Sequence, residues 1–294
     1  MSVYLKKYTN KHSRFAVVDD SLLHYRDEGK GHPILLLHGA FSSLHTFDYW
    51  TEILTDNGFR VLRFDLPGFG LTGSRSDHQY SMEIYVNTVF HFLDIMGLDK
   101  VSIAGNSLGG WLAWEFALKY PNHVDNLILI AAAGFIDDRS IPLPFKMAKT
   151  PFINKVIKYV VKRSVLEQFV KEVYGDPSKV TEELVDRYFH LFSREGNPEA
   201  FLAICNTKPK DNTPKLKKIK HETLIIWGEK DNWIPIEYAY RFDIEIPKTE
   251  LVIYEGVGHI PMEEIPEETA AELISFLSRK SSSIKASMRV SKSA

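Results

Sequence analysis

The fold of this chain is decided by the stretch VSIAGNSLGG, which runs from Val101 to Gly110. Its first four residues are apolar or small and predict a short buried strand, whereas the segment from Leu108 onward has helical periodicity. A strand that turns into a helix at one serine, Ser107, leaves little room two positions before and after it, and both positions are glycine. We therefore predict a strained strand-to-helix turn that raises the Ser107 hydroxyl above the edge of a sheet.

Short apolar runs alternate with segments of helical period along most of the chain. Strands are predicted at Phe15–Val18, Leu22–Tyr25, Ile34–Leu37, Val61–Phe64, Val101–Ala104, Leu127–Ala131, Leu224–Trp227 and Leu251–Tyr254. Helices are predicted at roughly 45–56, 81–96, 108–119, 235–243 and 266–279. This alternation predicts an α/β fold, with a mostly parallel sheet of about eight strands and helices on both faces.

The alternation stops between residues 134 and 220, where only helical patterns occur. One apolar stripe comprises Ile153, Val156, Ile157 and Val160, and a second comprises Leu166, Phe169, Val170 and Val173. A third helix is predicted over Glu182–Ser193. We therefore expect a helical cap at 134–220, inserted into a core formed by 1–133 and 221–280, and a mobile tail at 281–294.

The composition fits a large α/β core, since 44% of the 294 residues are hydrophobic and 12% are aromatic. A formal net charge of -2 gives no reason to expect a nucleic-acid partner. The one cysteine, Cys205, can form neither an internal disulfide nor a cysteine-rich metal site. No apolar run typical of a signal peptide or a membrane span occurs. We therefore expect a cytoplasmic protein that acts on a small molecule, with no cofactor, metal or membrane span.

The predicted insertion is more basic than the rest of the chain. Residues 141–220 hold 16 Lys and Arg against 9 Asp and Glu. The basic face of the insertion carries Lys155, Lys158, Lys162, Arg163 and Lys171. We interpret it as a solvated face, with weak association with an anionic lipid surface or an acidic substrate as the alternative.

A serine hydroxyl becomes a useful nucleophile only when a base takes its proton. His259 follows the last predicted strand in a glycine-rich loop, a suitable place to present an imidazole. Asp231 follows the preceding strand and can hold that imidazole in one tautomer. We therefore predict Ser107 as nucleophile, His259 as general base and Asp231 as the supporting acid.

Other carboxylates in the sequence are alternative candidates for the acid that supports His259. Glu229 lies two residues before Asp231, and Asp137 and Asp138 follow the strand Leu127–Ala131. We prefer Asp231, because the order serine, acid, histidine is the one this strand-and-helix arrangement requires.

The oxyanion formed by serine attack needs two preplaced N–H donors. The backbone of Leu108, next after the nucleophile, is predicted to supply one. The loop after Ile34–Leu37 is predicted to supply the other, with Ala40 as first choice and Phe41 as second. Phe41 is also predicted to contact the substrate, and His38 to brace the loop by hydrogen bonds.

A perfect G-x-G-x-x-G pattern at 68–73 could indicate a dinucleotide site. Such a site requires the loop to open directly into a helix, whereas a polar stretch at 74–79 follows here. We therefore interpret the pattern as a glycine-rich turn beside the active site.

These motifs together resemble those of the α/β-hydrolase superfamily over roughly residues 14 to 280. The matching elements are His38-Gly39, Asp65-Leu66-Pro67-Gly68-Phe69-Gly70, Gly105-Asn106-Ser107-Leu108-Gly109-Gly110, Gly228-x-x-Asp231-x-x-x-Pro235 and Gly258-His259-x-Pro261-x-x-Glu264. The insertion lies where members of that superfamily carry a helical cap.

Departures from particular relatives narrow the expected activity. Epoxide hydrolases and haloalkane dehalogenases of this fold use an aspartate nucleophile, whereas this chain has Ser107. Carbon–carbon bond hydrolases that act on ring-cleavage products usually have a Ser-Gly-Pro-Gly-like loop and a tryptophan after the catalytic histidine. This chain has AFSS at 40–43 and Ile260, and it lacks the loop proline of cofactor-free perhydrolases. The remaining resemblance is to capped carboxylesterases and lipase-like esterases.

We therefore expect a serine carboxylesterase that forms an acyl-enzyme. A carbon–carbon bond hydrolase, a thioesterase or a lactonase on the same triad are the alternatives, and a ligand receptor without catalysis is a further one. Aromatic residues of the insertion suggest an apolar acyl or alcohol pocket between cap and sheet, namely Phe145, Phe152, Tyr159 and Phe169.

Overall fold

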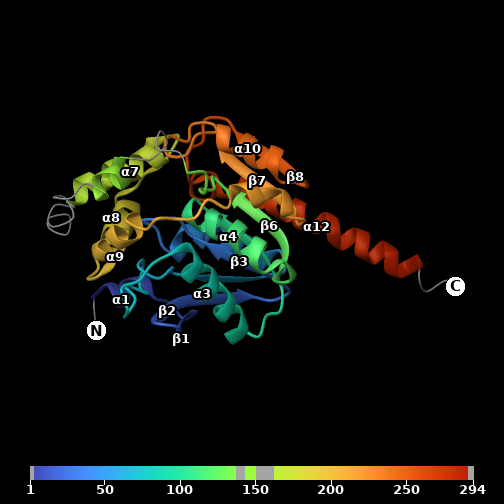
Figure 1. Ribbon diagram of the computed structural model, residues 1–294, viewed down its shortest axis with the longest axis horizontal. Helices are drawn as coiled ribbons and strands as arrows, with labels where there is room; N and C mark the ends of the chain where they lie inside the picture. The colour runs from blue at the N-terminus through green and yellow to red at the C-terminus, as the bar shows by residue number, and fades with distance from the viewer. Residues whose placement is uncertain (1–2, 137–142, 150–161, 291–294) are drawn as a thin grey trace.

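A twisted β-sheet with helices packed around it organises the molecule (Figure 1), and among the described residues this sheet has eight strands. The computed structural model describes residues 3–136, 143–149 and 162–290, with side chains up to residue 279. The strand order is β1-β2-β4-β3-β5-β6-β7-β8. The bounds are β1 Ser13–Val18, β2 Ser21–Gly29, β3 His32–Leu37, β4 Phe59–Phe64, β5 Val101–Asn106, β6 Val124–Ile130, β7 Glu222–Gly228 and β8 Thr249–Tyr254. The eight predicted strands are confirmed, each within a few residues of its expected bounds.

Pairing within the sheet is mostly parallel. β2 pairs antiparallel with both β1 and β4, and every other neighbouring pair is parallel. Because parallel strands end at the same edge, the loops after β3, β5, β7 and β8 lie together there. These four loops carry the predicted oxyanion donor, nucleophile, acid and base.

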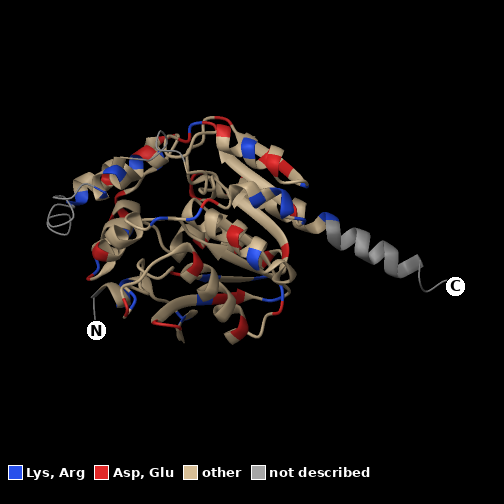
Figure 2. Cartoon of the chain, viewed as in Figure 1, with Lys and Arg blue, Asp and Glu red and all other residues tan. Residues whose placement is uncertain are grey.

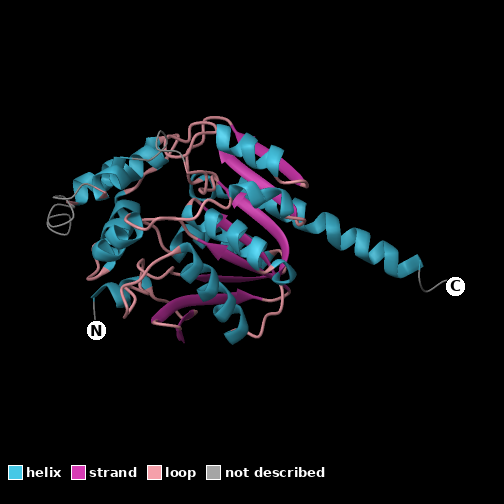
Figure 3. Ribbon diagram, in the orientation of Figure 1, coloured by secondary structure: helices cyan, strands magenta, loops and turns pink. Residues whose placement is uncertain are grey.

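Helices cover the sheet, as the alternating pattern predicts (Figure 3). They are α1 Val3–Tyr8, α2 Asp48–Asp56, α3 Met82–Ile95, α4 Leu108–Lys119, α10 Glu237–Glu245, α11 Pro261–Glu264 and α12 Pro266–Val290. α3 packs on α4, and α2 packs on α12, where Trp50 Nε1 donates to Thr269 Oγ1 at 2.9 Å. α12 continues well past residue 279, where the sequence predicted the helix to end, and projects from the body of the molecule (Figure 1).

The segment between β6 and β7 contains helices and no strand in its described part. Its α-helices are α5 Leu143–Ala148, α7 Arg163–Val173, α8 Glu182–Phe192 and α9 Asn197–Cys205. The predicted stripe on α7 is confirmed, with Leu166, Val170 and Val173 buried. The stripe at 153–160 lies outside the described residues.

Charges of both signs are interspersed along the helices of the insertion (Figure 2). Arg163 forms ion pairs with Glu182, Asp186 and Glu167, and Lys171 pairs with Glu167. Arg163 and Lys171, two of the three described residues of the basic face, are therefore paired with acidic neighbours, which favours its interpretation as a solvated surface. In the parts of the chain described here, no helix combines the length and apolarity that crossing a membrane requires.

The predicted close contact between β5 and α4 is present at Ser107. A Cβ added at Gly105 would lie 2.1 Å from the Gly109 carbonyl oxygen, and one added at Gly109 would lie 2.1 Å from the Leu37 carbonyl oxygen. Both obstacles are backbone atoms that cannot rotate away, so only glycine fits at either position.

Alanine at Gly109 should therefore destabilise the protein by about 3 kcal/mol or more, because the clash can be relieved only by separating α4 from β3. Gly97→Ala provides a control, since Gly97 has a φ of +63° but no neighbouring atom within 4 Å of an added Cβ. That variant should lose only about 1–2 kcal/mol, from backbone strain alone. Urea denaturation followed by tryptophan fluorescence would measure both losses, and equal losses would contradict the explanation.

Candidate active site

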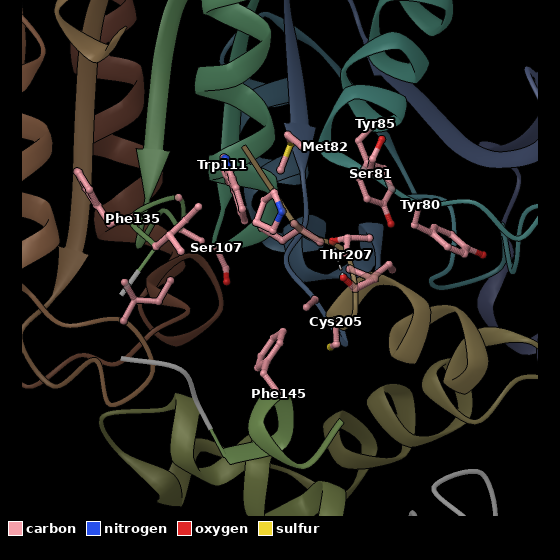
Figure 4. A pocket seen from close by; sticks show the side chains of 18 of the residues that line it. Tyr80, Ser81, Met82, Tyr85, Ser107, Trp111, Phe135, Phe145, Cys205 and Thr207 are labelled. Atoms are coloured by element: carbon pink, nitrogen blue, oxygen red, sulfur yellow. Dashed lines mark hydrogen bonds between the residues drawn. The ribbon is translucent and has the colours of Figure 1, made fainter. Parts of the chain in front are cut away.

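Ser107 occupies the turn between β5 and α4 in a strained conformation, with φ 55° and ψ -116°. Its amide donates to the Ile130 carbonyl at 3.0 Å, and its own carbonyl accepts from Trp111 and Ala133, both at 3.0 Å. The backbone is thus held on both sides, and the side chain is left free to extend into a cavity (Figure 4).

Asp231 and His259 lie together at the same edge of the sheet. His259 Nδ1 is 2.8 Å from Asp231 Oδ2, and both side chains are almost fully buried. The other carboxylate oxygen, Oδ1, accepts from the amides of Trp233 and Ile234 at 2.8 and 2.9 Å. Asp231 is therefore fixed in one orientation, as an acceptor that selects an imidazole tautomer must be.

The structure places none of the alternative acids against the His259 imidazole in its described part. Glu229 is exposed, and its Oε2 accepts from the Gly256 amide at 3.1 Å. Asp137 and Asp138 lie outside the described residues.

Ser107 and His259 line one small cavity together. Within the described residues, no hydrogen bond joins the Ser107 hydroxyl to the imidazole. Such bonds are often loose without substrate and tighten when substrate binds, so the geometry is compatible with a nucleophile and its base.

Two side chains that the sequence analysis did not select as site residues hold the His259 loop. Asn106 Nδ2 donates to the His259 carbonyl at 3.0 Å and to the Ile130 carbonyl at 3.2 Å. The Glu264 carboxylate accepts a hydrogen bond from the Gly258 amide at 2.8 Å. It also accepts from two backbone amides of the insertion, Gly175 at 3.0 Å and Asp176 at 2.8 Å. The sequence does contain a signal for Asn106, namely a polar side-chain amide directly before the nucleophile, at the end of a strand predicted to be buried.

The insertion also contacts this loop through its backbone. The His259 amide donates to the Val173 carbonyl, at the end of α7, at 2.7 Å. A Cβ added at Gly258 would lie 2.3 Å from the same carbonyl oxygen. The end of α7 is therefore one of the supports of the imidazole.

The loop after β3 lies against the nucleophile. A Cβ added at Gly39 would be 3.0 Å from Ser107 Cβ. Ala40 and Leu108 line the same cavity as Ser107, and in the described part of the chain neither amide donates to another protein group. These two amides are therefore available to a substrate oxygen.

His38 braces this loop, as predicted. Its Nε2 accepts from the Leu66 amide at 2.9 Å, so Nδ1 carries the proton and donates to the Gly39 carbonyl at 2.7 Å. Complete burial lowers the pKa of His38, which keeps the ring neutral.

Phe41 has a φ of +63°, and its ring packs on Phe201 and Phe192 of the insertion, with centroids 4.2 and 5.1 Å away. It lines the small cavity, not the large one.

The glycine pattern at 68–73 wraps the buried carboxylate of Asp65. A Cβ on Gly70 would lie 2.2 Å from Asp65 Cγ, and the next helix begins only at Met82. Asp65 accepts from the Leu44 and Leu71 amides, both at 2.7 Å, and contacts His24 Nδ1 at 2.8 Å. The interpretation of the pattern as a glycine-rich turn is confirmed.

Two cavities meet at Ser107. The larger measures about 270 Å³ and has mostly apolar walls, including Trp111, Phe135, Phe145, Ile204 and Tyr238 (Figure 4). The smaller measures about 30 Å³ and contains Phe169 in its wall. Of the four predicted pocket aromatics, Phe145 and Phe169 thus line cavities, and Phe152 and Tyr159 lie outside the described residues. No cluster of three metal-binding side chains occurs among the described residues.

A buried ion pair lies next to the small cavity. Arg187 of α8 contacts Glu263 at 2.7 Å, with 18% and 4% of the two side chains exposed. Burial alone would lower the pKa of Arg187, but the Glu263 carboxylate, together with Asp48 and the phenols of Tyr188 and Tyr174, outweighs burial, and the pKa is raised. Tyr174 and Tyr188 also donate to Glu263, at 3.0 and 3.2 Å, so this carboxylate is fully engaged and the guanidinium is neutralised.

Glu263→Gln should destabilise the protein by about 3–5 kcal/mol, because Arg187 would stay buried without its counter-charge. The double variant with Arg187→Met should recover a large part of that loss. Asp27→Asn, at the more exposed Arg60–Asp27 pair, is the matched control and should cost about 1 kcal/mol or less. Urea denaturation measures all three, and a double variant no more stable than Glu263→Gln would refute the explanation.

Known proteins resemble this chain over most of its length. A family described as having the alpha/beta hydrolase fold matches residues 32–266. A 2-hydroxy-6-oxo-6-phenylhexa-2,4-dienoate hydrolase of Comamonas testosteroni is 27% identical, over 92% of this chain and 97% of that protein. A 2-hydroxy-6-oxononadienedioate/2-hydroxy-6-oxononatrienedioate hydrolase of Dechloromonas aromatica (strain RCB) is 31% identical, over 88% of this chain and 91% of that protein. The structure of a thermophilic esterase from Thermogutta terrifontis has a TM-score of 0.78 at 23% identity, over 91% of this chain and 98% of that chain, which shows the shared fold.

Proposed function

The chain belongs to the alpha/beta hydrolase fold family, and we propose that it is a serine hydrolase that cleaves a neutral carboxylic ester. The observation that carries this proposal is the apolar cavity of about 270 Å³ that opens on Ser107, beside the buried Asp231–His259 pair. A polar reaction centre at the end of an apolar cavity suits a carbonyl compound with an apolar substituent.

The proposed reaction has two steps. Ser107 attacks the ester carbonyl while His259 takes its proton, and Asp231 stabilises the resulting imidazolium. The amides of Ala40 and Leu108 donate to the oxyanion. The alcohol leaves with a proton from His259, and water activated by the same imidazole then releases the acid from Ser107.

We also propose that residues 134–220 act as a cap on the core of residues 1–133 and 221–280. The large cavity supports this division, because Phe145 and Cys205 of the insertion line it together with Ser107 of the core.

Charge in the site favours a neutral substrate. Among the described residues, Lys149 is the one charged side chain in the wall of the large cavity, and it is exposed. Arg187 is neutralised by Glu263. A substrate carboxylate would therefore lose water in the cavity without a buried counter-charge to replace it, which is costly.

Ser107→Ala should lower turnover of methyl esters by about 10⁶-fold, because the nucleophile is lost. Asp231→Asn should lower it by about 10⁴-fold, because the imidazole tautomer is no longer selected. A pH-stat assay with methyl esters of acids from acetate to decanoate would follow acid release.

Two matched replacements serve as controls. Ser178→Ala and Glu229→Gln alter exposed side chains outside both cavities and should leave turnover within about twofold of wild type. Substantial turnover by Ser107→Ala would refute the nucleophile, and a large loss in Glu229→Gln would reassign the acid. A folded wild type that hydrolyses none of these esters would refute the proposed activity.

Cleavage of a carbon–carbon bond is the second candidate, and the names of the curated relatives favour it more directly than ester cleavage. Those names describe 2-hydroxy-6-oxo dienoates, whose hydrolysis at the 6-oxo group separates two carbon atoms. The same serine and base could serve, with the dienoate carbon as leaving group.

The dienoate 2-hydroxy-6-oxo-6-phenylhexa-2,4-dienoate separates the two candidates. We expect its kcat/KM to be at least about 100-fold below that of the best methyl ester, because its carboxylate has no buried counter-charge here. Loss of the dienoate's absorbance measures the rate. A kcat/KM above that of every ester would replace the first candidate by the second.

A further inference from the structure

The two cavities at Ser107 differ in size and in the catalytic groups they contain. They measure about 270 and about 30 Å³, and Ser107, Ala40 and Trp233 line both. Leu108 lines only the large cavity, whereas His259 lines only the small one. The base and one of the two proposed oxyanion donors therefore stand on different sides of the nucleophile.

This separation orients the substrate. The imidazolium that forms during attack must give its proton to the leaving oxygen, so that oxygen has to lie on the His259 side of the carbonyl carbon. The alcohol part then extends into the small cavity. The acyl substituent, on the opposite side of the same carbon, extends into the large cavity.

The small cavity can hold only one or two heavy atoms, since a single water already needs about 10–15 Å³ of such space. Its wall on the insertion side is formed by Leu166, Phe169, Val170 and Val173 of α7 and by Tyr188 of α8. Of these, Leu166, Val170 and Tyr188 are buried. The Tyr188 hydroxyl donates to Glu263 at 3.2 Å, so this ring is tethered and cannot easily turn away to enlarge the space.

We propose, on the basis of the proposed ester hydrolysis, that the enzyme selects methyl or similarly short alkyl esters of bulky apolar acids. In the first step the Ser107 oxygen gives its proton to His259 and bonds to the acyl carbon, the bond from that carbon to the alkoxy oxygen breaks, and the His259 imidazolium protonates the departing alkoxide, which leaves as the alcohol. In the second step water replaces Ser107, which yields the acid and restores the serine proton. Leu166, Val170 and Tyr188 determine the size of the alcohol.

Isomeric esters test this orientation without changing the protein. Methyl phenylacetate and benzyl acetate contain the same atoms, with the bulky group on the acyl side in one and on the alcohol side in the other. Methyl heptanoate and hexyl acetate form a second such pair. In wild type we expect kcat/KM at least about tenfold higher for the methyl ester of each pair, since misplacing even one methylene in a tight pocket costs about that much.

A variant then locates the selectivity. Val170→Ala and, separately, Leu166→Ala should raise the ratio of kcat/KM for hexyl acetate over methyl heptanoate by about fivefold or more, because each removes atoms from the small cavity wall. Val165→Ala, on the same helix but lining neither cavity, should leave the ratio unchanged.

The outcomes are distinct. Acetates hydrolysed as fast as their methyl isomers would overturn the orientation while leaving ester hydrolysis in place. Hydrolysis of none of the four esters would refute the proposed function, and the orientation with it. A methyl preference that persists unchanged in both enlarged variants would overturn the assignment of Leu166 and Val170.

Discussion

The close approach of the α4 backbone to the backbones of β5 and β3 is the constraint on which the rest of the site depends. Gly105 and Gly109 face carbonyl oxygens so closely that no side chain fits at either. This contact sets the angle at which the chain leaves the sheet, and it imposes on Ser107 a backbone conformation that an L-residue rarely adopts. The strain is sustained because the hydrogen bonds of the surrounding strands over-determine the turn.

Parallel strand pairing places the Ser107 turn next to the loops that carry the other proposed catalytic residues. Since β3, β5, β7 and β8 all end at one edge, their following loops are brought together without any long-range recognition between their side chains. The remaining precision comes from a few buried polar side chains. Asn106 links the nucleophile turn to the His259 loop, and Glu264 links that loop to the insertion.

The sequence predicted the fold well, and it selected side chains that the structure places at one edge of the sheet, because these features have local causes. Hydrophobic runs reveal buried strands, paired glycines reveal the turn at Ser107, and chain order ranks Asp231 above its rivals. The acidic partner of Arg187 could not be predicted, because the two residues are far apart in the sequence and meet only in the folded chain, where side chains of α8 reach Glu263 of α11. The size of the small cavity could not be predicted from the sequence either, because it depends on how side chains from several elements pack together. The sequence pattern ends α12 too early, because the last turns of this helix are rich in serine and lysine and carry no clear apolar stripe. The division into core and cap stays a prediction.

The hydrogen bond from the His259 amide to the Val173 carbonyl makes substrate choice and reaction rate interdependent. The same helix, α7, that narrows the small cavity also supports the backbone of the base. A substitution there that admits a larger group can also displace the imidazole, so its effect will depend on which other substitutions are already present. Such epistasis means that new specificities in this scaffold are reached more readily by paired changes, one that opens the wall and one that restores the support of the histidine loop.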